Sequence, residues 1–435
     1  MSHEQTLARI GVRLADILLP RPDVDLERWA VVACDQYTAQ PDYWAAVEQL
    51  VGDSPSTLRL IYPEVYLGEP QPQARIDAIN ASMRDYLERG LLDTYEKTLL
   101  LVRRQTATGV LRWGVMVALD LEQYSWNADD HTLIRATEGT ILDRIPPRKQ
   151  VRKDAPLELP HIMVLISDPT RSVIEPLSRL SPDSKPLYDT TLMQHGGRVT
   201  GWAVPADAIT AFVDALAVLH DALDPSDPLL FAMGDGNHSF ATAKSCWEDL
   251  KPTLDDAERE THPARWALVE IENIFDPGLE FEPIHRVLFD TPREAFESEL
   301  AGHCASYTVM PAETTAEVMQ RVDSSTEQTF GYCDKTTYAT YTLSLPDASI
   351  PAGTLQAVID ALVAAGREVD YIHGTDATSE IGRRESNVGL FLPAVPKESF
   401  FASIVADGTL PRKTFSLGEA DDKRYYLESR RIQAS

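Results

Sequence analysis

The segment LFAMGDGNHSFATAK, residues 230–244, brings two glycines, an aspartate, an asparagine and a histidine together between apolar residues. The apolar run before the glycines is typical of a buried strand, and the apolar residues from Phe240 to Leu250 recur at the spacing of one helical face. The sequence therefore predicts a strand-to-helix turn at residues 234–237. The first backbone N–H groups of a helix have no partner within it and carry the positive end of its dipole, so such a turn suits an anionic group such as phosphate.

The side chains of this turn could contribute chemistry as well as binding. Gly234 and Gly236 permit positive φ and let a ligand approach the backbone closely. Asp235 could act as a base or bind Mg²⁺, and His238 could donate to a phosphate or exchange a proton. The alternative is a purely structural turn in which Asn237 caps the helix and His238 lies on the surface. The segment fits neither the Walker pattern nor the dinucleotide fingerprint.

The elements that must position this turn are predicted to be a mixture of helices and strands. The pattern predicts a helix within residues 1–20, a strand, turn and helix within 29–52, a helix over 74–90, a hairpin over 98–124, a charged loop over 137–160, a strand over 161–167 and a helix over 206–223. Later come a hairpin over 327–345, a helix over 355–366, a strand within 386–395 and a helix over 398–408.

Hairpins among the helices favour an α+β fold with mixed or antiparallel sheets over a doubly wound parallel sheet. We expect a main domain over residues 1–290 that carries the turn, and a C-terminal α+β portion over residues 291–435 packed on it. No linker marks this boundary, so a single domain also fits the sequence.

The composition narrows the classes of partner. The 40 basic and 67 acidic residues give a formal net charge of −27, which repels nucleic acid and anionic lipid surfaces. Four cysteines are scattered singly, without metal-ligand spacing, and no apolar run is long enough to span a membrane. We therefore expect a cytoplasmic protein whose partners are small molecules, with neither nucleic acid nor membrane among them; the sequence does not define an oligomeric state.

Several segments, taken in order, resemble a known bacterial family. These are ACDQYTAQPDYW, STLRLIYPEVYL, ATEGTI, GDGNHSFATAK, PIHRVLF and LPRKTFSL, and together they resemble the domain of unknown function 1015 family from about Ala30 to about Arg431. Many members carry DGHHR where this chain has residues 235–239, and that form is similar to the phosphate-binding turn of the ParB/sulfiredoxin-like fold. Relatives of that fold include ATP- or ADP-dependent free serine kinases, ParB CTPases and sulfiredoxin.

The resemblance implies a ParB/sulfiredoxin-like core and phosphoryl transfer, with Mg²⁺ and ATP or ADP, to the hydroxyl of a small metabolite such as serine. Two departures bear on this: Asn237 stands where the family has its first histidine, and Ser239 stands where it has arginine. Loss of the arginine removes a bidentate phosphate donor. This branch would then use another substrate, recruit a cation from elsewhere, or have lost catalysis.

Cations that could replace the arginine lie in two basic loops. Arg148, Lys149, Arg152 and Lys153 lie in PPRKQVRKDAP, and Arg412 and Lys413 lie in LPRKTF. For the base, the resemblance points to Glu138, because the corresponding family segment carries a glutamate after a histidine; here Thr137 precedes it.

The candidate site has three catalytic and seven ligand-binding residues. The catalytic candidates are Glu138, Asp235 and His238, and Asp235 is also the metal candidate. The candidates for binding nucleotide are Gly234, Gly236, Asn237, Ser239, Lys149, Arg152 and Lys413. Secondary candidates are Asp35, Gln36, Arg59, His285 and Arg286, for each of which a structural role is the alternative.

Other classes of protein fit less well. A metal hydrolase needs three or more converging ligands, and a serine hydrolase of the α/β class carries a G-x-S-x-G elbow that this sequence lacks. The alternative that remains is a non-catalytic protein of the same fold that senses or binds nucleotide, because the turn lacks the arginine. A kinase would consume nucleotide in proportion to an added acceptor, whereas a sensor would leave the acceptor unchanged.

Overall fold

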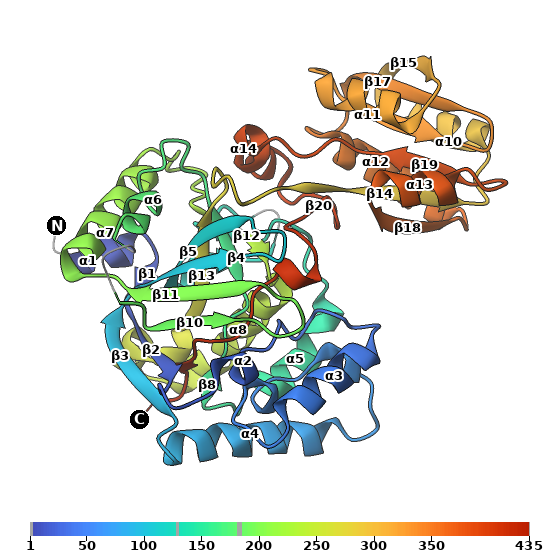
Figure 1. The fold of residues 1–435 in the computed structure, drawn as a ribbon. Coiled ribbons are helices and arrows are strands. Elements are labelled where there is room, and N and C mark those ends of the chain that lie inside the picture. The colour runs from blue at the N-terminus through green and yellow to red at the C-terminus, as the bar shows by residue number, and fades with distance from the viewer. Residues whose placement is uncertain (1–2, 128–129, 181–184, 435) are drawn as a thin grey trace. The chain divides into compact units, whose positions relative to one another are not determined.

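The computed structural model describes residues 3–127, 130–180 and 185–434, which form two compact units (Figure 1). The first unit comprises Met1–Glu280 together with Leu417–Ser435, and the second comprises Phe281–Ser416. The expected division kept residues 291–435 together, whereas the last part of the chain returns to the first unit. The predicted turn lies in the first unit.

Alternating apolar residues build a large sheet in the first unit. Within the described residues it has ten strands in the order β10-β11-β4-β5-β13-β9-β12-β7-β6, with β1 paired to β5. The strands are β1 (Val12–Arg13), β4 (Leu100–Gln105), β5 (Leu111–Asp120), β6 (Tyr124–Ser125), β7 (Ile134–Arg135), β9 (Met163–Ile166), β10 (Tyr188–Thr191), β11 (Arg198–Ala203), β12 (Phe231–Asp235) and β13 (Trp266–Asn273). The pairs β12–β7, β13–β9 and β6–β7 are parallel and the other pairs are antiparallel.

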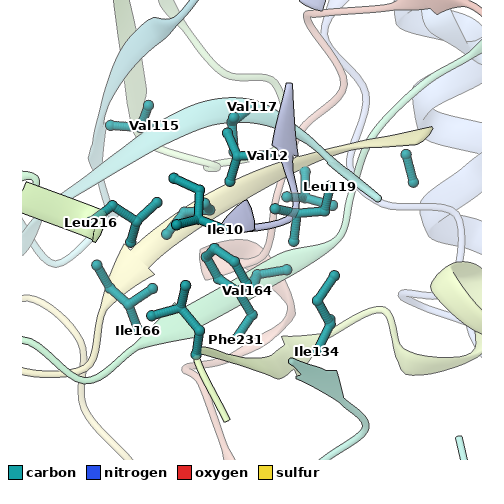
Figure 2. Close-up of a cluster of buried hydrophobic side chains, with 14 of the residues drawn as sticks. Ile10, Val12, Val115, Val117, Leu119, Ile134, Val164, Ile166, Leu216 and Phe231 are labelled. Carbon is teal, nitrogen blue, oxygen red and sulfur yellow. The ribbon is translucent and has the colours of Figure 1, made fainter. Parts of the chain in front are cut away.

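Both faces of this sheet are buried, because successive side chains of a strand point to opposite faces. On β5, Val115, Val117 and Leu119 face one apolar cluster, part of which is drawn in Figure 2, whereas Met116 and Ala118 face a second cluster. The first cluster includes side chains of α1, α7 and α8, and the second includes side chains of α2, α3 and α4. The sheet is therefore the middle layer of the first unit, with helices on both sides (Figure 1).

The helices of the first unit mostly follow the predicted pattern. They are α1 (His3–Arg9), α2 (Leu26–Trp29), α3 (Pro41–Val51), α4 (Pro72–Glu88), α5 (Ile145–Arg152), α6 (Glu175–Ser178), α7 (Ala206–Asp221), α8 (Asn237–Leu250) and α9 (Asp256–Thr261). The predicted helix over 74–90 is confirmed as α4, which ends before Gly90, and the predicted helix after the glycine turn is confirmed as α8. The hairpin over 98–124 is confirmed as β4 and β5.

The prediction of one helix reaching Pro20 was wrong beyond Arg9. Gly11 has φ of 67° and ends the helical path, and β1 then pairs with β5. The next strand, β2 (Ala15–Pro20), pairs with β3 (Leu92–Thr98) in a small separate sheet. Distant strand partners therefore determine this segment, and the helical spacing of its apolar residues was misleading.

The predicted loop over residues 137–160 contains helix α5, which the sequence interpretation missed. Pro146 and Pro147 lie in its first turn, where the fixed φ of proline suits a helix and the missing N–H would have no partner. Strand β8 (Leu157–Glu158) follows and pairs with β21 (Arg430–Arg431), so part of the C-terminal segment is held here.

The second unit has its own sheet and helices. Its strands lie in the order β15-β17-β16-β19-β14-β18, with β20 paired to β14, and every pair is antiparallel. The elements are β14 (Glu282–Phe289), α10 (Arg293–Leu300), β15 (Cys304–Ala312), α11 (Thr315–Ser324), β16 (Thr329–Cys333), β17 (Tyr338–Pro346), α12 (Pro351–Ala364), β18 (Glu368–His373), α13 (Thr375–Gly382), β19 (Val388–Phe391), α14 (Lys397–Asp407) and β20 (Phe415–Ser416). The two sheets confirm the predicted α+β class with mixed and antiparallel pairing. Among the described residues, no helix is both long and apolar enough to cross a membrane.

Candidate functional site

The predicted turn forms where β12 ends and α8 begins. Gly236 is the residue before the first helical position and has φ of 77°, a left-handed conformation that glycine adopts without strain. A Cβ on Gly236 would lie 3.0 Å from Cγ1 of Ile162, and one on Gly234 would lie 3.0 Å from side-chain atoms of Leu165 and Leu417. Tight packing thus favours glycine at both positions, apart from any ligand.

Asp235 is held at the turn by two donors. Its Oδ1 accepts the Gly236 N–H at 2.8 Å, and its Oδ2 lies 3.2 Å from Nζ of Lys423, which arrives from the C-terminal segment. Burial acts to raise the pKa of Asp235, but Lys423, the Gly236 N–H and His161 together lower it below its usual value. The side chain is therefore a carboxylate at neutral pH, next to a cation that the sequence analysis did not select.

The segment that carries Glu138 lies against the turn. Strands β7 and β12 are parallel neighbours, so the residues that follow them emerge at the same edge of the sheet. The Thr137 hydroxyl donates to the Met233 carbonyl at 2.7 Å, and the Ile141 N–H donates to Nε2 of His238 at 3.3 Å. The structure thus brings the backbone of Glu138, Asp235 and His238 into one region. Because Nε2 of His238 accepts, the proton of the neutral ring is on Nδ1.

His161, also outside the predicted set, contacts a residue in the first turn of α8. Its Nε2 lies 2.8 Å from Oγ of Ser239, and its Nδ1 lies 2.8 Å from the Tyr426 hydroxyl. Asp35, a secondary candidate, places Oδ2 3.9 Å from Nε2 of the same ring and accepts at Oδ1 from the Gln36 side chain at 3.0 Å. Ser239, which stands in place of the family arginine, is therefore part of a partly buried polar network.

Three of the basic residues expected to compensate for the missing arginine, all on α5, are paired with carboxylates. Lys149 lies 2.6 Å from Asp249 and donates to Ser245, both well along α8. Arg152 pairs with Glu158, and Arg148 pairs with Glu64. Lys413 belongs to the second unit, where its Nζ lies 5.6 Å from the ring centre of Tyr371.

The remaining secondary candidates have structural contacts. Arg59 pairs with Glu48 at 2.6 Å and donates to the Gly52 carbonyl. His285 and Arg286 are buried on β14 of the second unit, where Nδ1 of His285 accepts the Leu392 N–H at 3.1 Å. These contacts explain why such residue types occur at these positions.

The sequence matches the model of a family described as "Protein of unknown function (DUF1015)" over residues 16–362. The chain belongs to this family. No curated protein matches the sequence. The resemblance expected from the ordered segments is thus confirmed at the level of the family.

Solved structures show a distant likeness to this DUF1015 chain. A free serine kinase in complex with AMP has 10% identity and a TM-score of 0.36, with 73% of this chain and 91% of that chain covered. A conserved hypothetical protein from Pyrococcus furiosus has 11% identity and a TM-score of 0.35, with 73% and 95% covered. SbnI with a C-terminal truncation, from Staphylococcus aureus, has 10% identity and a TM-score of 0.32, with 72% and 82% covered.

A cavity of about 150 Å³ lies beside Ser239 in the first unit of this DUF1015 chain. Ser239, His161 and Tyr426 contribute polar groups to its wall, and Cys34 also lines it. Burial is the largest cause of the raised pKa of Cys34, so the thiol stays protonated and is a poor nucleophile.

The side-chain oxygen of Asn237 is a polar atom of the turn that a ligand could contact. Its Oδ1 is buried, and within residues 3–127, 130–180 and 185–434 no hydrogen-bond partner is found for it. A buried polar atom of this kind is costly unless a donor is supplied, which a bound molecule or a water would do.

Lys423 and His161 are the site residues that sequence reasoning missed. Lys423 lies in DDKRYYLESR, where it follows two aspartates and reads as an ordinary surface residue, and His161 lies at the start of a predicted strand. The one local feature that could have drawn attention to Lys423 is that two cations, Lys423 and Arg424, directly precede Tyr425 and Tyr426 in an acidic chain. Their proximity to the turn arises from the tertiary fold.

Proposed function

We propose that this DUF1015 chain binds the phosphate groups of ATP or ADP at the N-terminus of α8 and transfers a phosphoryl group to the hydroxyl of a small metabolite. The observation that most supports this proposal is the parallel pairing of β7 with β12, together with the hydrogen bond from the Thr137 hydroxyl to the Met233 carbonyl. These contacts place the segment that carries Glu138 beside the glycine turn at the start of α8. Such a turn supplies backbone donors and dipole, and the carboxylate supplies a base.

In this proposal each residue has a defined part. The N–H groups of the turn, Nδ1–H of His238 and the Lys423 ammonium hold phosphate oxygens. Glu138 accepts the proton of the acceptor hydroxyl while the hydroxyl oxygen forms a bond to the terminal phosphorus. At the same time, the bond between that phosphorus and the bridging oxygen of the nucleotide breaks. The shortened nucleotide leaves with the bridging oxygen.

The metal has only one protein ligand in this proposal. Among the described residues, Asp235 does not belong to a group of three or more His, Cys, Asp or Glu ligand atoms close enough to hold one ion. Mg²⁺ that arrives with a nucleotide takes most ligands from phosphate and water, so Asp235 would suffice once Lys423 moves from it to the phosphate.

The test is product formation with a variant of the turn. The purified protein is incubated with Mg²⁺, ATP or ADP and a pool of hydroxylated metabolites that includes L-serine, and new phosphorylated species are detected by mass spectrometry. Asp235→Asn should lose the product while the fold persists, and Asp207→Asn, at the exposed first turn of α7, should retain it. Equal turnover in both variants would refute the assignment.

A nucleotide sensor without catalysis is the second candidate. It is favoured by one observation: Lys149, Arg152 and Arg148 are each paired with a carboxylate, so the basic helix offers the turn little net charge. Binding of ATP or ADP without any phosphorylated product, in the presence of the full pool, would select this candidate over the kinase.

A further inference from the structure

The cavity beside Ser239 has walls that a phosphate site alone does not explain. Leu60, Met83 from α4 and Leu268 from β13 are buried side chains that line it, and Val151 and Ala155 close the side formed by α5 and the residues after it. Apolar walls of this kind favour a ligand with a carbon body, because burying that body removes apolar surface from water.

The two arginines that line the wall each face a carboxylate. Arg148 pairs with Glu64, and Arg152 pairs with Glu158. Glu158 also accepts from Nε of Arg430 at 2.7 Å and from the Leu268 N–H at 2.9 Å. Each guanidinium on this wall thus already has a carboxylate partner within the protein, and an uncharged ligand avoids the cost of burying a further charge.

The Ser239 hydroxyl offers such a ligand a polar partner. The Ser239 hydroxyl has one hydrogen-bond donor site and two acceptor sites. The hydrogen bond to His161 occupies one of these three sites, whichever tautomer the imidazole adopts. Ser239 therefore keeps hydrogen-bonding capacity toward the cavity, at the same first helical turn whose N–H groups are proposed to hold phosphate. A ligand hydroxyl at Ser239 would lie beside the phosphate.

We infer that this cavity binds the phosphoryl acceptor, and that the acceptor is an uncharged aliphatic alcohol, with its hydroxyl at Ser239 and its carbon body against Leu60, Met83 and Leu268. The volume of about 150 Å³ is similar to that of an engineered apolar cavity that binds benzene, which corresponds to roughly six to eight non-hydrogen atoms. The assignment of the ligand as acceptor rests on the proposed function; the binding itself does not.

The test compares two probes of equal size, cyclohexanol and L-serine, by isothermal titration calorimetry without nucleotide. Cyclohexanol should bind at least tenfold more tightly than serine. Ala155→Leu, which fills the cavity, should abolish that binding, whereas Ala364→Leu on the exposed face of α12 should leave it unchanged. Val151→Phe serves as a second filling variant if Ala155→Leu fails to fold.

The outcomes separate the two proposals. Tighter binding of serine, or binding of cyclohexanol that survives both filling variants, would overturn the cavity assignment even if ATP or ADP binds normally. Binding of cyclohexanol by a protein that binds no nucleotide would support the cavity site and refute the proposed function. If both bind, consumption of ATP or ADP that rises with cyclohexanol supports the acceptor role, and consumption that does not rise overturns it.

Discussion

Asp235 and Lys423 form the pair on which the electrostatics of the turn depend. Replacing Lys423 by Met should raise the pKa of Asp235, because burial would still favour the neutral acid while the nearest cation is gone. Carboxyl NMR titration of wild type and variant measures this directly. Affinity for ADP should fall about tenfold, since a charge-assisted contact is lost.

The pH dependence of stability has a definite sign at Asp235. Its pKa is lowered in the folded protein, so the pair stabilises the fold at pH values above the unfolded value of about 3.9, and this contribution disappears as pH falls through the folded pKa. Lys423→Arg keeps the charge and serves as the control. An unchanged Asp235 pKa in Lys423→Met would contradict the assignment.

Thr137 connects the candidate base to the turn. Thr137→Val removes a buried hydrogen bond to the Met233 carbonyl and should cost about 1 kcal/mol of unfolding free energy while reducing turnover. Thr210→Val is the matched control, because that hydroxyl donates to the Ala206 carbonyl on an exposed face of α7. Denaturant titration and turnover are measured on both; full activity in Thr137→Val would show that Glu138 needs no such support.

At the scale of the element, the start of α8 depends on a glycine. Gly236→Ala should destabilise by about 1–2 kcal/mol through its positive φ, and by a further amount through contact with Ile162. Gly90→Ala isolates the first effect, because Gly90 has φ of 62° and nothing within 4 Å of its Cβ position. If Gly236→Ala and Gly90→Ala lose equal stability in thermal unfolding, the Ile162 side chain shifts to accommodate the added Cβ at no cost in free energy.

A buried histidine of β14, His285, accepts a hydrogen bond from the Leu392 N–H just after β19. Burial first, then Arg286 and His373, lower the pKa of His285 to about 4, from about 6.5 in the unfolded chain. Between these values the unfolded state binds a proton that the folded state does not, so stability should fall by about 3 kcal/mol as pH drops from 6.5 to 4. His285→Gln should lose that part of the pH dependence in denaturant titrations; identical profiles would contradict it.

Elements whose pattern is local were predictable, and those that depend on distant partners were not. Helices α4 and α8 and the β4–β5 hairpin follow from periodicity and from glycine at their ends. Strands β1 and β2 were assigned to a helix because their pairing partners lie far along the chain. The same reason explains the site: the turn was visible in one segment, but Lys423 and His161 reach it only through the tertiary fold.

At the scale of the whole molecule, the C-terminal segment is held to the first unit by buried charge. Arg424 lies 2.6 Å from Glu270 of β13, pairs with Glu428, and donates to the Pro160 carbonyl. Arg424→Met would leave buried carboxylates without a cation and should cost about 3–5 kcal/mol. Arg384→Met, at an exposed pair with Glu380, should cost less than about 1 kcal/mol by the same denaturant titration. Equal costs would refute this role.

The return of residues 417–435 to the first unit has a consequence for synthesis on the ribosome. Residues 281–416 leave the ribosome before the first unit has received the segment that contains Lys423, Arg424 and Tyr426. The second unit can thus fold during translation, whereas the first unit is completed only after residues 417–435 have been synthesised. A chain released before residue 423 would carry the complete glycine turn without the Lys423 ammonium, so the Asp235–Lys423 pair forms only after translation has passed that residue.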